Sequence, residues 1–577
     1  MTAQAMSRLM ARVQAHLDII YDDMPKDLTQ RVIDTMQYPA DIAEPAPYQN
    51  YWDQSDCWMI TYASSVQDGD EPGLKTLRRF CDEHLQDVIN GLHILPFFPY
   101  SSDDGFAVID YYAVDPTNGD WQDIQSLARR YRMMADLVIN HASSQSQWFK
   151  NFLARQDPGK DYFKETSPDE DLSMVVRPRS TPLRTEVDTA DGKRWVWCTF
   201  GPDQVDLDFA NPEVLLTFIE IIRTYLNHGV SVLRLDAVAF LWKEPGTSSL
   251  HDQRTHEIIK LLRTLVEFRD ASVMLITETN VPNRDNLTYF GNSNEAHAIY
   301  NFSLPPLLIH TLLTGDCRHL KTWMMSMPPA RFGTTYFNFI ASHDGIGMRP
   351  VDGLLSEAER TRLLETLTSF GGKISLRTGP DGAAHPYEVN ISLLDALAGT
   401  EKGKDDLQLD RFICAHAIML ALEGIPGLYI HSLLGTDNDY EGLARTGQYR
   451  SINRHRWDLS ALRAQLDDDA STQARVLSRL KHLIALRRGQ RAFHPNAVQF
   501  TLQLGLQVFG VWRQSLDRRQ DIFSISNVSV EEQVVELANI NLISTDHWRD
   551  LISGDAIDDQ QTTMTLQPYQ TVWLSNQ

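Results

Sequence analysis

Eight short runs of apolar residues, each followed by a loop and a helical stretch, place the strongest constraint on the fold of this chain. The runs are rich in β-branched and aromatic residues, which is typical of strands buried on both faces of a parallel sheet. The segments between them have helical periodicity, and the one at 212–229 ends in glycine. The runs occupy residues 57–62, 91–97, 133–139, 230–236, 273–278, 298–302, 335–340 and 426–430.

Strands that alternate with helices in this way favour a closed (β/α)₈ TIM barrel over an open doubly wound sheet. An open nucleotide-binding sheet would need a glycine-rich phosphate-binding turn after its first strand, and the sequence has none there. The predicted fold class is therefore α/β, a TIM barrel with inserted loop domains and a C-terminal antiparallel β domain.

Three segments depart from the repeating pattern and suggest the domain organisation. Residues 1–54 are predicted to form an N-terminal helical extension, 55–489 the catalytic barrel, and 490–577, which alternate with period two, the β domain. Two connections, at about 142–215 and 345–410, are too long for ordinary loops. Such insertions normally lie over the carboxyl-terminal face of a barrel and shape its active site.

The net charge of the chain limits its partners. A formal charge of −23 argues against nucleic acid or an anionic membrane surface. The five cysteines are scattered without metal-binding or redox spacing, as expected for reduced thiols. The sequence shows no signal-peptide pattern and no run of about 18 apolar residues. We expect a cytoplasmic protein.

Ionisable residues lie at the ends of four of the predicted strands, where barrel enzymes carry their catalytic groups. A single carboxylate at such a position is more often a cap or an ion-pair partner. Several groups on four strand ends converge around one axis, and this favours a site. They are His141, Arg234, Asp236, Glu278, His343 and Asp344.

Three carboxylates meet the needs of retaining glycosyl transfer. One attacks the anomeric carbon, a second protonates the leaving oxygen, and a third orients hydroxyls and stabilises positive charge. Arg234 precedes Asp236 by two residues and shares its strand face, so it would keep Asp236 ionised. Glu278 must hold a proton near neutrality, and we expect drier or more negative surroundings for it.

Five ordered stretches resemble the motifs of the α-amylase superfamily, glycoside hydrolase family 13: GLHILPFFPYSSDDGF, DLVINH, VSVLRLDAV, LITETN and FIASHDGIG. The resemblance covers residues 55–490, roughly the barrel. It implies that Asp236 is the nucleophile, Glu278 the acid/base and Asp344 the transition-state stabiliser. It also implies that glucose is bound by His141, Arg234 and His343.

Within that family the chain is most similar to the sucrose phosphorylase group, on the stretches ILPFFPYSSDDGF, QVDLDFANP, DAVAFLWKEPGTS, ASHDGIG and SINRH. This implies that Asp103 and Arg454 lie at the 4-hydroxyl of glucose and close the pocket around one glucosyl unit. It further implies glucosyl transfer to inorganic phosphate, giving α-glucose 1-phosphate. No cofactor and no metal are expected, because the group typically lacks the calcium that many superfamily members bind beside Asn140, and no DxDxDG run occurs.

The chain departs from the sucrose enzymes on the acceptor side. Glu388 follows Tyr387 where those enzymes have glutamine, and Phe240 stands where they usually have tyrosine. At these positions the chain resembles relatives that cleave glucosylglycerol, glucosylglycerate or sucrose 6′-phosphate. Glu388 would repel an anionic acceptor unless a cation paired with it, and this favours 2-O-α-glucosylglycerol as the substrate. Three arginines could supply that cation or bind phosphate: Arg177, Arg179 and Arg184.

Other functions remain open at this point. The alternatives are a sucrose, sucrose 6′-phosphate or glucosylglycerate phosphorylase, an α-glucosidase or sucrose hydrolase that uses water, and a catalytically silent partner subunit. The expected partners are inorganic phosphate and a small glucoside, without nucleic acid or membrane. We expect a monomer or a homodimer.

Overall fold

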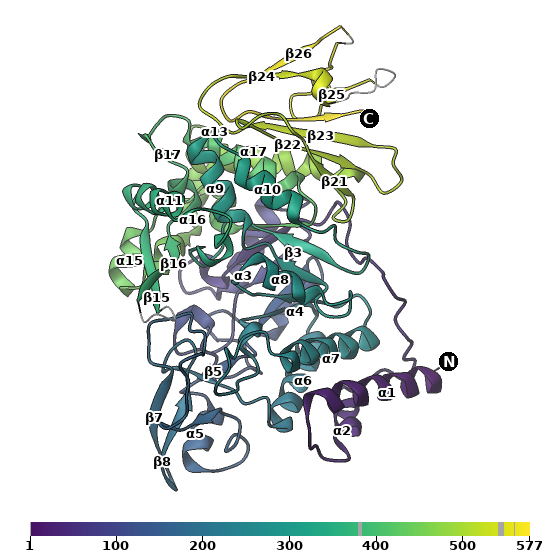
Figure 1. Ribbon diagram of the computed structural model, residues 1–577, viewed down its shortest axis with the longest axis vertical. Coiled ribbons are helices and arrows are strands. Elements are labelled where there is room, and N and C mark those ends of the chain that lie inside the picture. The colour runs from purple at the N-terminus through teal and green to yellow at the C-terminus, as the bar shows by residue number, and fades with distance from the viewer. Residues whose placement is uncertain (1, 379–382, 541–546, 559) are drawn as a thin grey trace.

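The computed structural model describes residues 2–378, 383–540, 547–558 and 560–577 (Figure 1). Eight parallel strands close into a barrel, with Trp58 of the first strand opposite Gly91 on one side and Gly427 on the other. Each predicted run overlaps one strand, and the predicted barrel is confirmed. The strands are β1 (Trp58–Thr61), β3 (Gly91–Ile94), β4 (Arg132–Leu137), β10 (Val230–Leu235), β11 (Met274–Thr277), β12 (Ala298–Tyr300), β13 (Thr335–Asn338) and β19 (Ile425–Tyr429).

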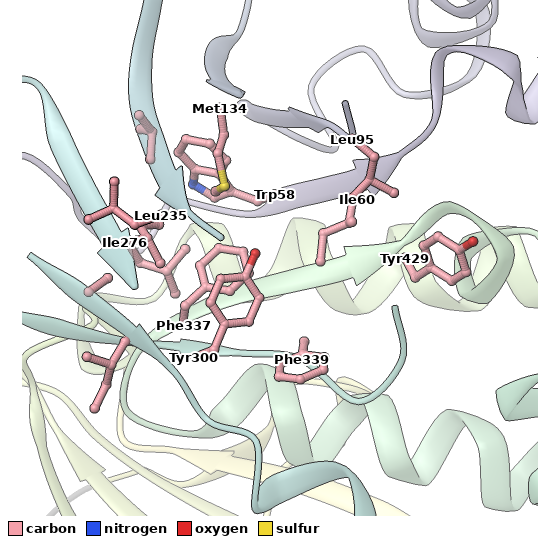
Figure 2. Close-up of a cluster of buried hydrophobic side chains, with 14 of the residues drawn as sticks. Trp58, Ile60, Leu95, Met134, Leu235, Ile276, Tyr300, Phe337, Phe339 and Tyr429 are labelled. Carbon is pink, nitrogen blue, oxygen red and sulfur yellow. The ribbon is translucent and has the colours of Figure 1, made fainter. Parts of the chain in front are cut away.

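The barrel interior is filled by large apolar side chains, which Figure 2 shows pointing toward one another from several strands. Trp58 is 1% exposed and Phe337 is fully buried. Their rings fit because glycine stands beside each: a Cβ on Gly91 would lie 2.0 Å from the Trp58 indole, and one on Gly427 would lie 2.4 Å from the Phe337 ring. The interior is therefore a packed core, which holds the strand ends rigidly.

Helices follow the strands and cover the outside of the barrel (Figure 1). The helix predicted at 212–229 begins where the Asn211 side chain accepts a hydrogen bond from the N–H of Glu213, and Pro212 occupies its first position. The main barrel helices are α3 (Gly73–His84), α4 (Trp121–Ala128), α6 (Pro212–Asn227), α7 (Gln253–Arg269), α9 (Leu304–Thr314), α13 (Gln408–Ala421) and α17 (Thr472–Arg488).

The two long connections form small structures of their own. The first contains β5 (His141–Ser143), α5 (Gln147–Ala154), β6 (Glu165–Thr166), β7 (Arg184–Thr189), β8 (Gly192–Trp197) and β9 (Gln204–Asp206). The second contains β14 (Ile346–Gly347), the 3₁₀ turn η5 (Arg349–Val351), α11 (Glu357–Ser369), β15 (Lys373–Thr378) and β16 (Ala384–Asn390). Strand β16 pairs with both β14 and β15. Because β14 begins two residues after Asp344, this pairing holds the end of the second insertion against the segment that follows Asp344.

The two N-terminal helices pack against helices of the barrel. Helix α1 (Thr2–Ile20) lies along α7, where His16 contacts Glu257 at 2.6 Å, and α2 (Leu28–Met36) lies along α6, where Arg31 pairs with Glu213 at 2.7 Å.

The C-terminal region is a five-stranded antiparallel sheet and a two-stranded one, seen at the top of Figure 1. They are built from β21 (Val498–Thr501), β22 (Val508–Gln514), β23 (Asp521–Asn527), β24 (Gln533–Glu536), β25 (Arg549–Asp550), β26 (Thr563–Leu566) and β27 (Thr571–Ser575). The domain limits 1–54, 55–489 and 490–577 stay predictions. Among the described residues, no helix has the length and apolar character needed to cross a membrane.

Candidate active site

A cavity lies at the carboxyl-terminal ends of the barrel strands. It gathers residues from the segments that follow β3, β10, β11 and β13 and from both insertions. Nine of the twelve predicted site residues line it: Asp103, His141, Arg179, Asp236, Phe240, Glu278, His343, Asp344 and Tyr387. Three predicted residues, Arg234, Glu388 and Arg454, lie behind its wall, and their contacts show how the wall is held together.

Arg234 lies beneath the cavity and contacts three carboxylates. Its Nη1 donates to Asp136 and, at 2.8 Å, to Oδ1 of Asp236, while its Nη2 lies 4.0 Å from Oε1 of Glu278. Asp136 is fully buried and also contacts Nε2 of His93 at 2.7 Å. The cation thus touches Asp236 from the same strand face, as predicted from their spacing on β10.

Glu278 is fixed by the backbone that follows Asp236. Its Oε2 accepts a hydrogen bond from the N–H of Ala237 at 3.0 Å. Ala237 has φ 50° and ψ 29°, a left-handed conformation that is uncommon for a residue with a Cβ. Strain of this kind persists where surrounding structure imposes it, and here it aims an amide at the carboxylate.

Burial dominates the proton affinity of this pair of carboxylates. It raises the pKa of Asp236 well above its ordinary value and also raises the pKa of Glu278, while the charge of Arg234 opposes both shifts. Two neighbouring buried carboxyls favour one shared proton. Because Arg234 touches Asp236 but stands 4.0 Å from Glu278, the negative charge is more stable on Asp236 and the proton on Glu278.

Asp344 is held by a residue that the sequence analysis did not select. Nη1 of Arg450 lies 2.5 Å from Oδ1 of Asp344. Burial raises the pKa of Asp344, but Arg450, Arg454 and Arg234 more than offset this, and the net shift is downward. Asp344 is therefore kept ionised. The available signal was the position of Arg450 directly before the stretch SINRH, which had been selected for other reasons.

Arg450 also binds Glu388, which we had expected to face the acceptor. Its two carboxylate oxygens accept hydrogen bonds from Nε and Nη2 of Arg450, each at 2.9 Å, and the residue is 1% exposed. Glu388 therefore does not face an acceptor. Arg184, one of the arginines expected to supply its cation, instead donates to the carbonyl of Ser167 at 2.7 Å.

Asp103 lines one end of the cavity, beside an aromatic stack. Phe106 stacks on His343 with ring centroids 5.0 Å apart, and Tyr62 meets His343 edge-on at 5.8 Å. Arg454 donates to the carbonyl of His343 at 2.9 Å. The structure thus places both predicted residues at this end, Asp103 on the cavity and Arg454 behind it.

Arg454 has a different main partner from the one its assignment beside Asp103 suggested. Its Nη1 lies 2.6 Å from Oδ2 of Asp104 but 4.0 Å from Oδ1 of Asp103. Burial raises the pKa of Asp103, and Arg450, Arg454 and Arg179 lower it further than burial raises it. Asp103 is left as a charged acceptor that faces the cavity.

The two histidines of the cavity are uncharged donors or acceptors at neutral pH. Burial lowers the pKa of His141 and takes that of His343 well below its ordinary value. Nε2 of His141 lies 2.8 Å from the carbonyl oxygen of Phe106. A neutral imidazole suits hydrogen bonding to sugar hydroxyls.

Aromatic rings and guanidinium groups form another part of the cavity lining, called the acceptor side below. Arg179 lies 5.3 Å above the ring of Tyr387 and 5.9 Å from that of Phe200. Phe200 meets Phe240 edge-on at 5.5 Å. Arg349 also lines this side, and the sequence analysis missed it because nothing marks it locally.

An ammonium group occupies the position beside Asn140. Nζ of Lys243 donates to Oδ1 of Asn140 at 2.8 Å and lies 3.2 Å from the buried carboxylate of Asp206. Across the described ranges, no three or more His, Cys, Asp or Glu side chains are grouped so as to hold a metal ion.

Comparison with known proteins agrees with this geometry. Residues 69–347 match the family described as alpha amylase, catalytic domain. The chain is 42% identical over 530 residues to the glucosylglycerate phosphorylase of Escherichia coli (strain K12), covering 91% of this chain and 93% of that protein. It is 30% identical over 433 residues to the glucosylglycerol phosphorylase of Marinobacter adhaerens, covering 73% and 85%.

A solved structure is also similar. The crystal structure of sucrose 6F-phosphate phosphorylase from Thermoanaerobacter thermosaccharolyticum has a TM-score of 0.72 and 26% identity, over 82% of this chain and 94% of that one. A barrel with these carboxylates at its strand ends, and these relatives, define a glycosyl-transferring phosphorylase. The chain belongs to the α-amylase family, glycoside hydrolase family 13. The resemblance and the enzyme class inferred from the sequence are both confirmed.

Proposed function

We propose that this enzyme catalyses the reversible phosphorolysis of glucosylglycerate to α-glucose 1-phosphate and glycerate. Glucosylglycerol was favoured because Glu388 would repel an anionic acceptor. Arg450 neutralises Glu388, so this repulsion is absent. The observation that carries the proposal is the positive charge of Arg179 and Arg349, which both line the cavity. In the described part of the chain neither has a carboxylate within 4.0 Å.

The similarity to known enzymes supports the same substrate. Identity to the glucosylglycerate phosphorylase of Escherichia coli is 42%, against 30% to the glucosylglycerol phosphorylase of Marinobacter adhaerens. The former also matches a larger share of this chain, 91% against 73%.

In the proposed mechanism, Asp236 attacks the anomeric carbon while Glu278 gives its proton to the glycosidic oxygen, so that glycerate leaves. The product of this step is a glucosyl ester of Asp236. Phosphate then attacks the same carbon from the face that glycerate left, and its proton passes to Glu278. The Asp236 ester bond breaks, the acid/base pair is restored, and the anomeric configuration is retained overall.

The remaining residues bind and orient the glucosyl group and phosphate in this proposal. Asp344, held ionised by Arg450, binds hydroxyls and stabilises the oxocarbenium-like transition state. Asp103 takes the 4-hydroxyl region, with His141 and His343 as neutral partners. Arg179 receives the incoming phosphate dianion.

The test runs the reaction in the synthetic direction. Glucose 1-phosphate is offered with glycerate, glycerol, fructose or fructose 6-phosphate, and phosphate release is measured. We expect the highest kcat/KM with glycerate. A higher value with glycerol would restore glucosylglycerol as the substrate. If glucosylglycerate gave free glucose at an unchanged rate without phosphate, the enzyme would be a hydrolase instead.

A further inference from the structure

Arg349 is fixed on the acceptor side of the cavity by the second insertion. It opens the turn η5, which follows β14, and the N–H of Met348 donates to the carbonyl of Tyr387 at 2.9 Å. A Cβ on Gly347 would lie 2.9 Å from the side chain of Asn280, so β14 runs close against the residues after β11. The Arg349 side chain lines the cavity together with Asn280 and Tyr387.

The guanidinium of Arg349 is mostly withdrawn from water without an ion-pair partner. Burial lowers its pKa, and the nearby acidic groups, Tyr387, Asp352 and Asp285, do not restore it. None of the described carboxylates lies within 4.0 Å of it. Arginine stays charged in proteins, and a desolvated charge is costly unless an anion meets it. A ligand with a negative group would supply that anion.

Arg179 and Arg349 reach the cavity from different insertions, Arg179 from the first and Arg349 from the second. The charge of Arg179 contributes to the lowered pKa of both Asp103 and Asp344, which stand at the glucosyl end. Arg349 is not among the main causes of either shift; its neighbours are Tyr387, Asp352, Asp285 and Arg377. The charge of Arg179 therefore acts on the carboxylates of the glucosyl end, whereas Arg349 stands beside Tyr387 and Asp352 of the second insertion.

We propose that Arg349 binds the negative charge of the acceptor, the carboxylate of glycerate, and thereby selects anionic over neutral acceptors. This inference rests on the proposed function and adds a residue to it. A planar guanidinium can donate two parallel hydrogen bonds to a carboxylate, which fixes the orientation of the acceptor as well as its charge. The hydroxyl of glycerate is then presented to the anomeric carbon beside Glu278.

The experiment compares wild type with Arg349→Gln and Arg349→Lys. Glycerate and glycerol are the acceptors in synthesis, and KM for phosphate is measured in phosphorolysis. Arg177→Gln is the matched control, because Arg177 lies in the same segment as Arg179 but does not line the cavity. Thermal melting checks that each variant is folded.

We expect Arg349→Gln to raise KM for glycerate by about tenfold or more, while KM for phosphate changes by less than about twofold. Arg349→Lys should recover part of the loss, and activity with glycerol should be retained. The inference is overturned if Arg349→Gln uses glycerate with an unchanged KM, or if it loses glycerate and glycerol equally.

Failure of the proposed function is distinguishable from failure of this inference. If wild type rejects glycerate and uses fructose 6-phosphate, the proposed substrate is wrong. The same comparison is then made with fructose 6-phosphate, and an unchanged KM in Arg349→Gln overturns the role of Arg349 as well.

Discussion

Arg450 holds Glu388 through two parallel hydrogen bonds, from Nε and Nη2 to the two carboxylate oxygens, each 2.9 Å long. Nη1 of the same guanidinium lies 2.5 Å from Asp344. Glu388 belongs to β16, and Arg450 to the 3₁₀ turn η6 (Tyr449–Asn453) after the last barrel strand. Glu388 lies outside the cavity, but it orients Arg450, and Arg450 in turn orients Asp344.

Replacing Glu388 by glutamine should therefore reduce activity without removing any group from the cavity. The charge on Arg450 would lose one of its two carboxylate partners, at a cost of about 3 kcal/mol in the free energy of unfolding. Because Arg450 then shifts, kcat for phosphorolysis should fall about tenfold. Urea unfolding and steady-state kinetics measure the two effects.

The matched control for this change is Glu365→Gln, an exposed glutamate of α11 in the same insertion. It should change neither quantity. Full activity in Glu388→Gln would show that Arg450 holds Asp344 without help from Glu388.

The barrel and its strand-end residues could be predicted from the sequence because each depends on local pattern. Strands buried on both faces need continuous apolar runs, and a residue that follows such a strand must lie near the barrel axis. Asp236 and Glu278 are of this kind. Arg450 and Arg349 are not, because their positions come from packing of the second insertion against distant loops. The pairing of β14 with β16 leaves no local signal.

The direction of the Glu388 side chain could not be predicted from local sequence either. The sequence places a glutamate after Tyr387 but does not show which way its side chain turns. That direction is set by a partner 62 residues away, Arg450. The charge repulsion from which the sequence favoured glucosylglycerol is absent for this reason.

Replacing Glu278 by glutamine should remove proton transfer while leaving the nucleophile in place. The pKa of Glu278 is raised by burial, so wild-type activity should be lost as pH rises through that value, when the acid loses its proton. It should also be lost as pH falls and the pair of carboxyls takes up a second proton, which neutralises the nucleophile. The expected kcat/KM profile is bell-shaped, and its two apparent pKa values belong to the pair of carboxyls rather than to either residue alone.

The variant is tested with two donors. With glucosylglycerate, Glu278→Gln should be slower by about a hundredfold or more, because glycerate cannot leave without a proton. With α-glucosyl fluoride, whose leaving group needs no protonation, formation of the glucosyl-enzyme should be much less affected. An equal loss with both donors would exclude Glu278 as the general acid.

Glu423 gives a prediction about stability and pH. It precedes β19, accepts a hydrogen bond from the N–H of Ala330 at 2.8 Å, and burial raises its pKa to about 7. The folded state then binds a proton that the unfolded chain releases near pH 4.3. Stability from this group is complete below that value and is lost as pH rises through about 7.

Glu423→Gln resembles the protonated form and should lack this dependence. The free energy of unfolding of Glu423→Gln, minus that of wild type, should rise by up to about 3 kcal/mol as the pH is raised from 4.5 to 8. Urea unfolding at several pH values measures the difference, again beside Glu365→Gln. Parallel curves for wild type and Glu423→Gln would mean that Glu423 does not titrate in this range.

The central claim, that Asp236 forms the covalent bond to glucose, is tested most directly by kcat of Asp236→Asn in phosphorolysis of glucosylglycerate. The comparison is with wild type and with Asp469→Asn, an exposed loop residue that does not line the cavity. We predict a loss of about a thousandfold or more in a folded protein, with no change in the control. Turnover within about tenfold of wild type would contradict the account.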